Sequence, residues 1–367
     1  MGFNCGIVGL PNVGKSTLFN ALTSTAAAEA ANYPFCTIEP NKGRVSVPDE
    51  RLLEISKLAN SEKVIGAQLE FVDIAGLVKG ASKGEGLGNQ FLANIRETDA
   101  IIHVLRCFED DNISHVEESI QPIRDIEIIE TELLLSDLES IDRQILNLEK
   151  KARSGDKDIK KQLEIVKKIA SKLEEGTPIR KYMDWDAQDE ELIKNTNMLT
   201  SKPLVYVCNV EEESAAIGNA LSREVEAYAK ADGSGCVIVS AAIEAEISQL
   251  TYQEEKNEFL TTLGLEEAGL NKLIRAGYSL LDLITFFTAG PKEARAWTLP
   301  KESTAPQGAG KIHSDFERGF IRAETISYDD YIAHSGENGA KEAGKLRVEG
   351  ADYLIKDGDV LHFRFNV

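Results

Sequence analysis

The chain has 367 residues, enough for about two or three domains. Hydrophobic residues make up 42% and charged residues 28%, a balance typical of a globular protein with a buried core. Acidic residues outnumber basic residues by 61 to 41, and the resulting net charge of −20 argues against a protein that coats nucleic acid through phosphate contacts. The longest apolar runs are strand-sized, far short of the ~20 residues of a membrane helix.

The N-terminus and the cysteines both favour a cytoplasmic protein. Residues 1–6 (Met-Gly-Phe-Asn-Cys-Gly) lack the basic and apolar segments of a secretion signal. The five cysteines are scattered, and no two have a C-x-x-C spacing. This pattern predicts reduced, buried cysteines rather than a zinc site. No pattern indicates an oligomer, so we expect a monomer.

Short apolar runs alternate with helical stretches in the first third of the chain, and the pattern resumes after residue 200. Buried strands are predicted at residues 3–9, 44–47, 69–73, 100–106, 203–208 and 236–240. Helices are predicted at residues 16–23, 49–59 and 214–230, with another between residues 73 and 100. Strands separated by helices predict an α/β domain with a doubly wound, mostly parallel sheet.

Two apolar stripes with near-heptad spacing lie between these two groups of strands. The stripes are Leu134, Leu138, Ile141, Ile145 and Leu148, then Ile159, Leu163, Val166, Ile169 and Leu173. A turn signal at residues 153–156 lets the stripes face each other when the chain reverses. Residues 125–149 carry eight acids and one base, whereas residues 150–172 carry nine bases and three acids. The sequence therefore predicts an antiparallel coiled-coil hairpin with opposed charges.

The C-terminal part has a different pattern. Residues 266–283 are helical in period, and short strand-like runs separated by turn residues follow from residue 284. Asp357-Gly358 is a strong hairpin turn before the last strand. We expect a separate mixed β/α domain at residues 281–367, and we interpret residues 308–311 (Gly-Ala-Gly-Lys) as a loop.

Residues 9–16 (Gly-Leu-Pro-Asn-Val-Gly-Lys-Ser) match G-x-x-x-x-G-K-[ST] between a predicted strand and a predicted helix, the context of a P-loop. Gly9 and Gly14 would let backbone N–H groups turn toward phosphates at the helix N-terminus. Lys15 would neutralise the β- and γ-phosphates, and Ser16 would give its hydroxyl to Mg²⁺. The predicted phosphate-binding residues are Asn12, Val13, Gly14, Lys15, Ser16 and Thr17.

Asp73-Ile74-Ala75-Gly76 ends a predicted strand with the D-x-x-G pattern of nucleotide switches. Asp73 would hold Mg²⁺ through water, and the Gly76 N–H would sense the γ-phosphate. Lys15, Asp73 and Gly76 are therefore the candidate catalytic residues. Spacing alone leaves a second Mg²⁺ hydroxyl open among Thr23, Thr25 and Thr37.

A guanine-reading N-K-x-D motif would follow the strand at residues 203–208, but the chain has Asn209-Val210-Glu211-Glu212 there. Val210 stands where the motif has the lysine that covers the base. Glu212 stands where the motif has the aspartate that accepts hydrogen bonds from guanine, and its side chain is one methylene longer. Adenine offers no donor at N1 and no 2-amino group, and a spoiled pairing geometry weakens discrimination for guanine. We predict that ATP is preferred over GTP, with Asn209 and Val210 beside the base.

Ser240 and Ala241, after the next strand, would close this base pocket. In the alternative interpretation, Glu212 is a solvated residue at a helix start, and Glu211 or another group reads guanine.

Leu77 stands where a water-orienting glutamine commonly follows D-x-x-G, and leucine cannot hydrogen-bond a nucleophile. Intrinsic hydrolysis is therefore expected to be slow. A partner could supply the missing group, or Asn12 could hold a monovalent cation such as K⁺ near the phosphates.

Together these residues resemble the YchF/Obg-like ATPase branch of the Obg-related translational GTPase superfamily. The resemblance runs through residues 9–17, 35–41, 73–88, 209–212 and 310–324, and it covers nearly the whole chain. It implies ATP binding by residues 12–17 and Val210, and Mg²⁺ binding by Ser16 and Thr37. It also implies a C-terminal TGS domain of β-grasp type and a ribosomal or ribosomal-RNA partner.

We therefore expect a P-loop NTPase (Obg-type G) domain at residues 1–122 and 197–280, a helical coiled-coil insertion at 123–196 and a TGS domain at 281–367. The predicted function is a slow, Mg²⁺-dependent ATP hydrolase that acts as a nucleotide-dependent switch on the ribosome. One alternative is a GTPase of the Obg type. Another is a ribosome- or RNA-binding module that holds ATP as a mainly structural ligand. No DNA or membrane partner is expected.

Overall fold

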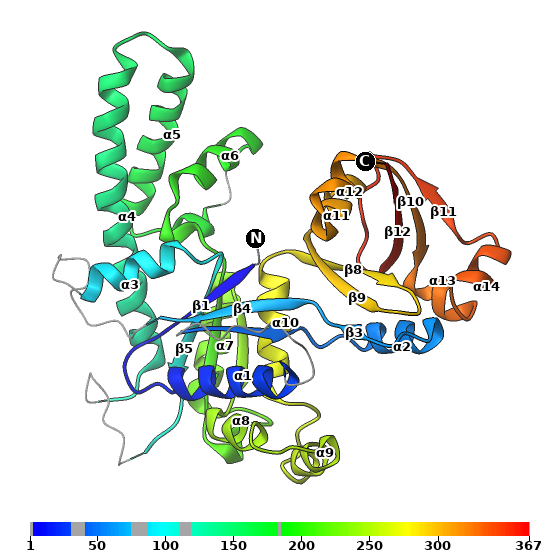
Figure 1. The fold of residues 1–367 in the computed structure, drawn as a ribbon. Helices are drawn as coiled ribbons and strands as arrows, with labels where there is room; N and C mark the ends of the chain where they lie inside the picture. The colour runs from blue at the N-terminus through cyan, green and yellow to red at the C-terminus, as the bar shows by residue number, and fades with distance from the viewer. Residues whose placement is uncertain (1–2, 31–40, 75–86, 111–118, 183–184, 367) are drawn as a thin grey trace. The chain divides into compact units, whose positions relative to one another are not determined.

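The computed structural model describes residues 3–30, 41–74, 87–110, 119–182 and 185–366 (Figure 1). These described residues form two compact units, one within residues 3–44 and 70–280, the other within residues 45–69 and 281–367. No helix of the described ranges is both long enough and apolar enough to cross a membrane.

The first unit is built around a six-stranded sheet. Its strands, in spatial order, are β2 (Lys42–Ser46), β4 (Gln68–Asp73), β1 (Asn4–Val8), β5 (Ala100–Arg106), β6 (Leu204–Asn209) and β7 (Gly235–Val239). The pairings from β4 through β7 are all parallel. Every residue of β5 and β6 is buried, as expected for central strands of a parallel sheet covered by helices.

Helices connect and cover these strands. They are α1 (Lys15–Ala30), α3 (Leu87–Arg96), α7 (Ala220–Asp232), α8 (Ala241–Ile247), α9 (Gln253–Thr262) and α10 (Gly269–Leu280), with the short 3-10 helix η4 (Glu212–Ser214). Both α7 and α10 pack against β6 and β7. The predicted α/β P-loop fold is confirmed. Because the strands are parallel, their carboxyl ends meet at one edge, where ligands bind in such sheets.

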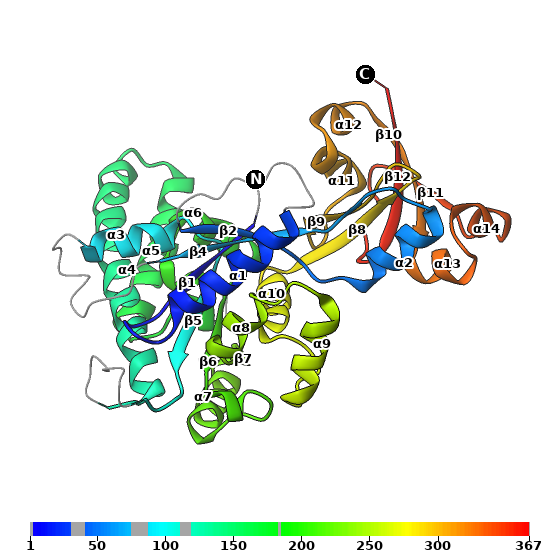
Figure 2. The same cartoon turned by 60° about the horizontal axis from the view of Figure 1, so that its bottom comes forward.

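A long helical hairpin is inserted between β5 and β6. It consists of α4 (Pro122–Ala152) and α5 (Lys157–Glu174), which lie side by side in both views (Figure 1, Figure 2). All residues of the two predicted stripes belong to one apolar cluster, so the predicted facing of the arms is confirmed. Lys167 and Glu149 form an exposed ion pair of 2.7 Å between the arms. The return segment contains η2 (Ile179–Lys181), α6 (Ala187–Thr196) and η3 (Leu199–Ser201).

The second unit has its own six-stranded sheet. The spatial order is β11 (Arg347–Glu349), β10 (Phe320–Ser327), β12 (Asp359–Phe365), β8 (Leu283–Ala289), β9 (Ala294–Pro300) and β3 (Val64–Ile65). The last strand, β12, pairs in parallel with β8, and each pairs antiparallel with its other neighbour. This arrangement is compatible with the predicted β-grasp architecture. The helices of this unit include α12 (Ser314–Arg318), α13 (Tyr328–Ala333) and α14 (Glu337–Glu342).

Residues 45–69 lie in a different unit from the one predicted. We expected the helix at residues 49–59 to belong to the nucleotide-binding domain, but α2 (Glu50–Ala59) packs against β8 and β9 of the second sheet. The Arg51 guanidinium pairs with Asp357 at 2.7 Å and lies 5.3 Å from the centre of the Phe287 ring. An amphipathic pattern indicates that one face of a helix is buried, but not which sheet covers it.

Residues 308–311 are likewise not the loop that we predicted. They belong to α11 (Ala305–Ile312), which a proline in its first turn and reciprocal hydrogen bonds between Thr304 and Gln307 initiate. A Cβ added at Gly308 would lie 2.3 Å from the Ile355 side chain, so close packing explains the glycine.

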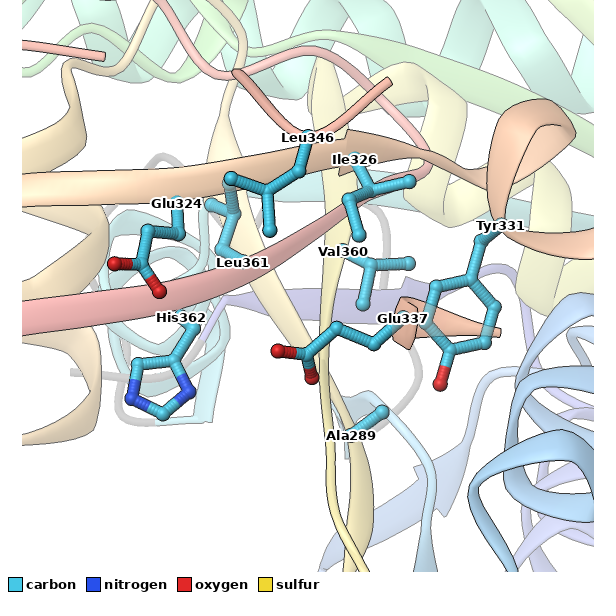
Figure 3. Close-up of a pocket in the computed structure, with 9 residues that line it drawn as sticks. All are labelled: Ala289, Glu324, Ile326, Tyr331, Glu337, Leu346, Val360, Leu361 and His362. Carbon is cyan, nitrogen blue, oxygen red and sulfur yellow. The ribbon is translucent and has the colours of Figure 1, made fainter. Parts of the chain in front are cut away.

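A hollow elsewhere in this unit, beside Glu324, Glu337 and His362, encloses about 10 Å³, room for a single water molecule (Figure 3).

The apolar seam of the hairpin predicts a large difference between two substitutions on α4. Ile141 is fully buried between the arms, whereas Leu146 is 59% exposed on the same helix. Ile141→Ala should destabilise the hairpin by about 2–5 kcal/mol through lost burial and a residual cavity. Leu146→Ala should change stability by less than about 0.5 kcal/mol. Hydrogen exchange of the hairpin amides measures both, and equal effects would contradict the seam.

Candidate functional site

The predicted P-loop joins β1 to α1 at the carboxyl edge of the first sheet. Asn12 and Gly14 both have left-handed backbone conformations, with φ of 63° and 95°. At Gly14 the absence of a side chain is also a packing requirement, because a Cβ there would lie 2.2 Å from Nδ2 of Asn209. Gly14 therefore permits both the turn of the loop and the close approach of β6.

Lys15 begins α1 and is almost completely buried. Its Nζ donates to the carbonyl oxygen of Leu10 at 3.1 Å. Burial lowers the pKa of the Lys15 ammonium, and the nearby Asp73 carboxylate opposes that shift. A cation desolvated at a helix N-terminus is arranged to meet an anionic ligand.

Asp73, at the end of β4, is the acidic partner in this arrangement. Burial raises the pKa of its carboxyl group, while the Lys15 charge and a hydrogen bond with the Ser16 side chain lower it. Oδ1 of Asp73 is buried without a hydrogen-bond partner in the described part of the chain. An unpartnered carboxylate oxygen beside the Ser16 hydroxyl fits the oxygen ligands that Mg²⁺ prefers.

The described residues contain no group of three or more His, Cys, Asp and Glu side chains placed to hold a metal ion by themselves. A Mg²⁺ ion at Ser16 and Asp73 would therefore need phosphate oxygens as well, which is its usual mode of binding at nucleotide sites. The two other predicted residues, Thr37 and Gly76, lie outside the described residues, and their roles stay predictions.

Asn209 connects the P-loop to the predicted base pocket. Its Nδ2 donates to the Val13 carbonyl at 3.0 Å, and its Oδ1 accepts from the Ala241 N–H at 2.9 Å. One side chain thus joins the loops that follow β1, β6 and β7. Val210, the next residue, is 2% exposed, and its N–H donates to the Val239 carbonyl.

The two acids that follow Val210 have different environments. Glu211 accepts hydrogen bonds from the Ser214 hydroxyl at 2.5 Å and from Nδ2 of Asn219 at 2.9 Å. Burial raises the pKa of the Glu211 carboxyl, but these hydrogen bonds and one from its own backbone outweigh burial and lower it. Glu212 starts η4 and is exposed. Of the two, Glu211 is therefore committed to bracing the loop.

A cavity of about 670 Å³ brings most of the predicted residues together, within the usual range of small-molecule sites. Its lining is Asn12, Gly14 and Thr17 of the P-loop, with residues 108–110, 209–213 and 240–242. Ser240 lines this cavity and is 2% exposed, and its hydroxyl oxygen has no hydrogen-bond partner in the described ranges. A bound ligand would satisfy that oxygen.

The wall formed by residues 108–110 was not predicted from the sequence. Arg106, at the end of β5, is 1% exposed and donates from Nε to the Phe108 carbonyl and from Nη2 to the Asp110 carbonyl. Its guanidinium also lies 4.7 Å from the centre of the Phe108 ring. An arginine at the end of a fully buried strand was an available signal, because such a residue needs buried acceptors.

Gly14 and Gly155 have similar backbone conformations but different surroundings, which makes Gly155 a control for a substitution at Gly14. Gly14→Ala would displace Asn209 and break its two hydrogen bonds, so it should weaken triphosphate binding about thirtyfold, for two bonds of ~1 kcal/mol each. Gly155, at the hairpin tip, has a φ of 89° and no atom within 4 Å of an added Cβ. Gly155→Ala should leave calorimetric affinity unchanged, and equal losses would rule out the packing explanation.

Two family models match the chain. The model described as 50S ribosome-binding GTPase matches residues 4–152, and the model named YchF-GTPase_C, described as a protein of unknown function, matches residues 283–366.

The chain is also similar over its full length to curated proteins named ribosome-binding ATPase YchF. It is 60% identical to the one from Haemophilus ducreyi and 57% identical to the one from Escherichia coli O157:H7, each over 367 residues and 100% of both chains. It is 53% identical to the one from Bacillus subtilis, again over 100% of both chains.

Among solved structures, the chain is similar to the Schizosaccharomyces pombe YchF GTPase. The identity is 38% and the TM-score 0.90, and the match covers 99% of this chain and 98% of that one. With full-length relatives above half identity and a matching structure, the chain belongs to the YchF family of P-loop nucleotide hydrolases.

Proposed function

We propose that this chain binds Mg²⁺·ATP in the 670 Å³ cavity, hydrolyses it slowly, and uses the nucleotide state to control its association with the ribosome. The observation that carries the proposal is the joining of a P-loop to a base pocket through Asn209. The curated relatives are named ribosome-binding ATPases, which supports the same partner and reaction. A ribosomal partner places the chain in the cytoplasm, and we propose that it acts as a monomer.

In this proposal the phosphates lie along the P-loop. Backbone N–H groups of residues 12–17 and the N-terminus of α1 face the β- and γ-phosphates, and Lys15 neutralises their charge. Ser16 would hold Mg²⁺ directly, and Asp73 would hold it through water. Bound Mg²⁺ supplies compensation for the charge that develops on the phosphoryl oxygens. Thr37 as a second Mg²⁺ hydroxyl and the Gly76 N–H as γ-phosphate sensor complete the proposed set.

The base preference rests on the residues directly after β6. Relatives are named both ATPase and GTPase, so the names leave the base open. A guanine site needs a fixed carboxylate that accepts two hydrogen bonds and a lysine over the base. Here Val210 is buried, Glu211 is bonded to Ser214 and Asn219, and Glu212 is exposed on η4. These positions disfavour guanine pairing and support ATP, with Ser240 and Ala241 closing the pocket.

Hydrolysis in this proposal is slow until a partner completes the site. Leu77, which stands in the place of a catalytic glutamine, lies outside the described residues. We propose that ribosome binding supplies the missing positioning of water. Asn12, which is exposed in the lining of the cavity, is the proposed contact for a K⁺ ion that could assist.

Restoring the guanine-reading residues should reverse the base preference. The double variant Val210→Lys, Glu212→Asp should shift the ratio of ATP to GTP affinity toward GTP by about tenfold or more, the value of one charged hydrogen bond. Glu213→Asp is the matched control, because it shortens another acid in the lining of the same cavity without touching the motif. Calorimetry with Mg²⁺ measures both nucleotides. A wild type that binds GTP far more tightly than ATP would refute the proposed preference and favour an Obg-type GTPase.

A second experiment separates an enzyme from a binding module that holds ATP structurally. ATP hydrolysis by wild type should rise when ribosomes are added, and Lys15→Ala should abolish the rise. Lys311→Ala, which alters the glycine-lysine pair of α11 in the other unit, should retain it. If ribosomes bind equally well with and without ATP and never stimulate hydrolysis, the switch is excluded and the binding module is favoured.

A further inference from the structure

Three segments of the first unit meet where the coiled coil leaves the sheet. They are the end of α3, the first half of α4, and residues 196–202 of the return segment. We call this meeting point the root junction. It consists of Arg96, Ser136, Asp137, Asn197, Thr200 and Lys202, all of which belong to one compact unit.

Arg96, the last residue of α3, binds both of the other segments. Its Nη2 donates to the Ser136 hydroxyl of α4 at 3.0 Å, and its Nη1 donates to the Asn197 carbonyl at 2.9 Å. The guanidinium also lies 3.7 Å from the Asp137 carboxylate. The planar fork of arginine suits this divided contact, whereas a lysine would supply one flexible ammonium.

Asp137 completes the junction from the side of α4. It is fully buried, and its two oxygens accept from the Leu199 N–H at 2.9 Å, the Thr200 N–H at 2.8 Å and the Thr200 hydroxyl at 2.8 Å. Lys202 adds hydrogen bonds from Nζ to the carbonyls of Arg96 and Thr98. Each segment is therefore held by side chains from another, and a shift of one must break or move bonds to the others.

The order of elements along the chain connects the root junction to the nucleotide site. β4 ends at Asp73, and α3, the next helix in the described part of the chain, ends at Arg96. From the junction, η3 leads directly into β6, which returns to Asn209 at the base end. The coiled coil is thus bonded to α3 and to η3, which leads into the strand that ends at Asn209.

We propose that the root junction is the joint through which the nucleotide state alters the coiled-coil hairpin, with Arg96 as the positioning residue. The proposal rests on the proposed function in one respect, namely that the site distinguishes ATP from ADP. A static brace would hold the hairpin equally in both states. A joint makes exchange protection of the hairpin depend on the nucleotide, because coupling of two sites is a difference between states.

Hydrogen exchange of the full chain tests this without ribosomes. In wild type, hairpin amides at residues 134–174 should exchange about fivefold or more differently with a non-hydrolysable ATP analogue than with ADP. Arg96→Lys should reduce the difference below about twofold and keep ATP affinity within about threefold. Arg143→Lys is the matched control: Arg143 is exposed on α4 and donates to the Glu139 carbonyl of its own helix, so full dependence should remain.

Ser136→Ala serves as a milder variant in case Arg96→Lys lowers the melting temperature. It removes one acceptor of Arg96 and should reduce the difference in exchange partially. Equal hairpin exchange in the two states of wild type, or full dependence in both junction variants, would overturn the joint. Failure of the proposed function is distinguishable, because it would appear in wild type as absent ATP binding or as hydrolysis that ribosomes never stimulate.

Discussion

The side chain of Asn209 is the contact on which the arrangement of the site depends. It donates to the P-loop at Val13 and accepts from Ala241, and it occupies the space beside Gly14 that any Cβ would fill. Three loops from three strands are therefore fixed by one amide whose donor and acceptor are both used. Because a buried amide that loses a partner is costly, these loops hold their positions together.

A second constraint is the burial of charge around this contact. Lys15 and Asp73 are both desolvated. Burial lowers the pKa of Lys15 and raises the pKa of Asp73, so in each case it favours the neutral form. Arg106 is buried as well, and it spends its hydrogen bonds on the wall of the cavity. A ligand that brings phosphate and a divalent cation together would stabilise the charged forms of both Lys15 and Asp73. The proposed occupant would therefore offset the free-energy cost of burying these two charges.

Away from the cavity, the chain contains a long helical hairpin that the nucleotide-binding fold itself does not require. Its seam is apolar, and its attachment at Arg96 and Asp137 is polar and largely buried. An apolar attachment could slide, whereas hydrogen bonds of fixed direction specify one geometry at a time. The apolar seam is suited to a rigid hairpin, and the polar root junction is suited to hold that hairpin in one specific geometry.

Periodicity and local motifs in the sequence predicted the parallel sheet, the facing stripes of the hairpin, and the P-loop with its lysine, because the patterns that indicate these features each extend over a short stretch of chain. The tertiary structure alone decided that α2 covers the second sheet, that Arg106 builds a cavity wall, that Glu211 braces a loop while Glu212 is exposed, and that Arg96 meets the hairpin. Those outcomes depend on which surfaces, distant in the sequence, pack against each other. A hydrophobic pattern indicates that a face is buried but not which element covers it.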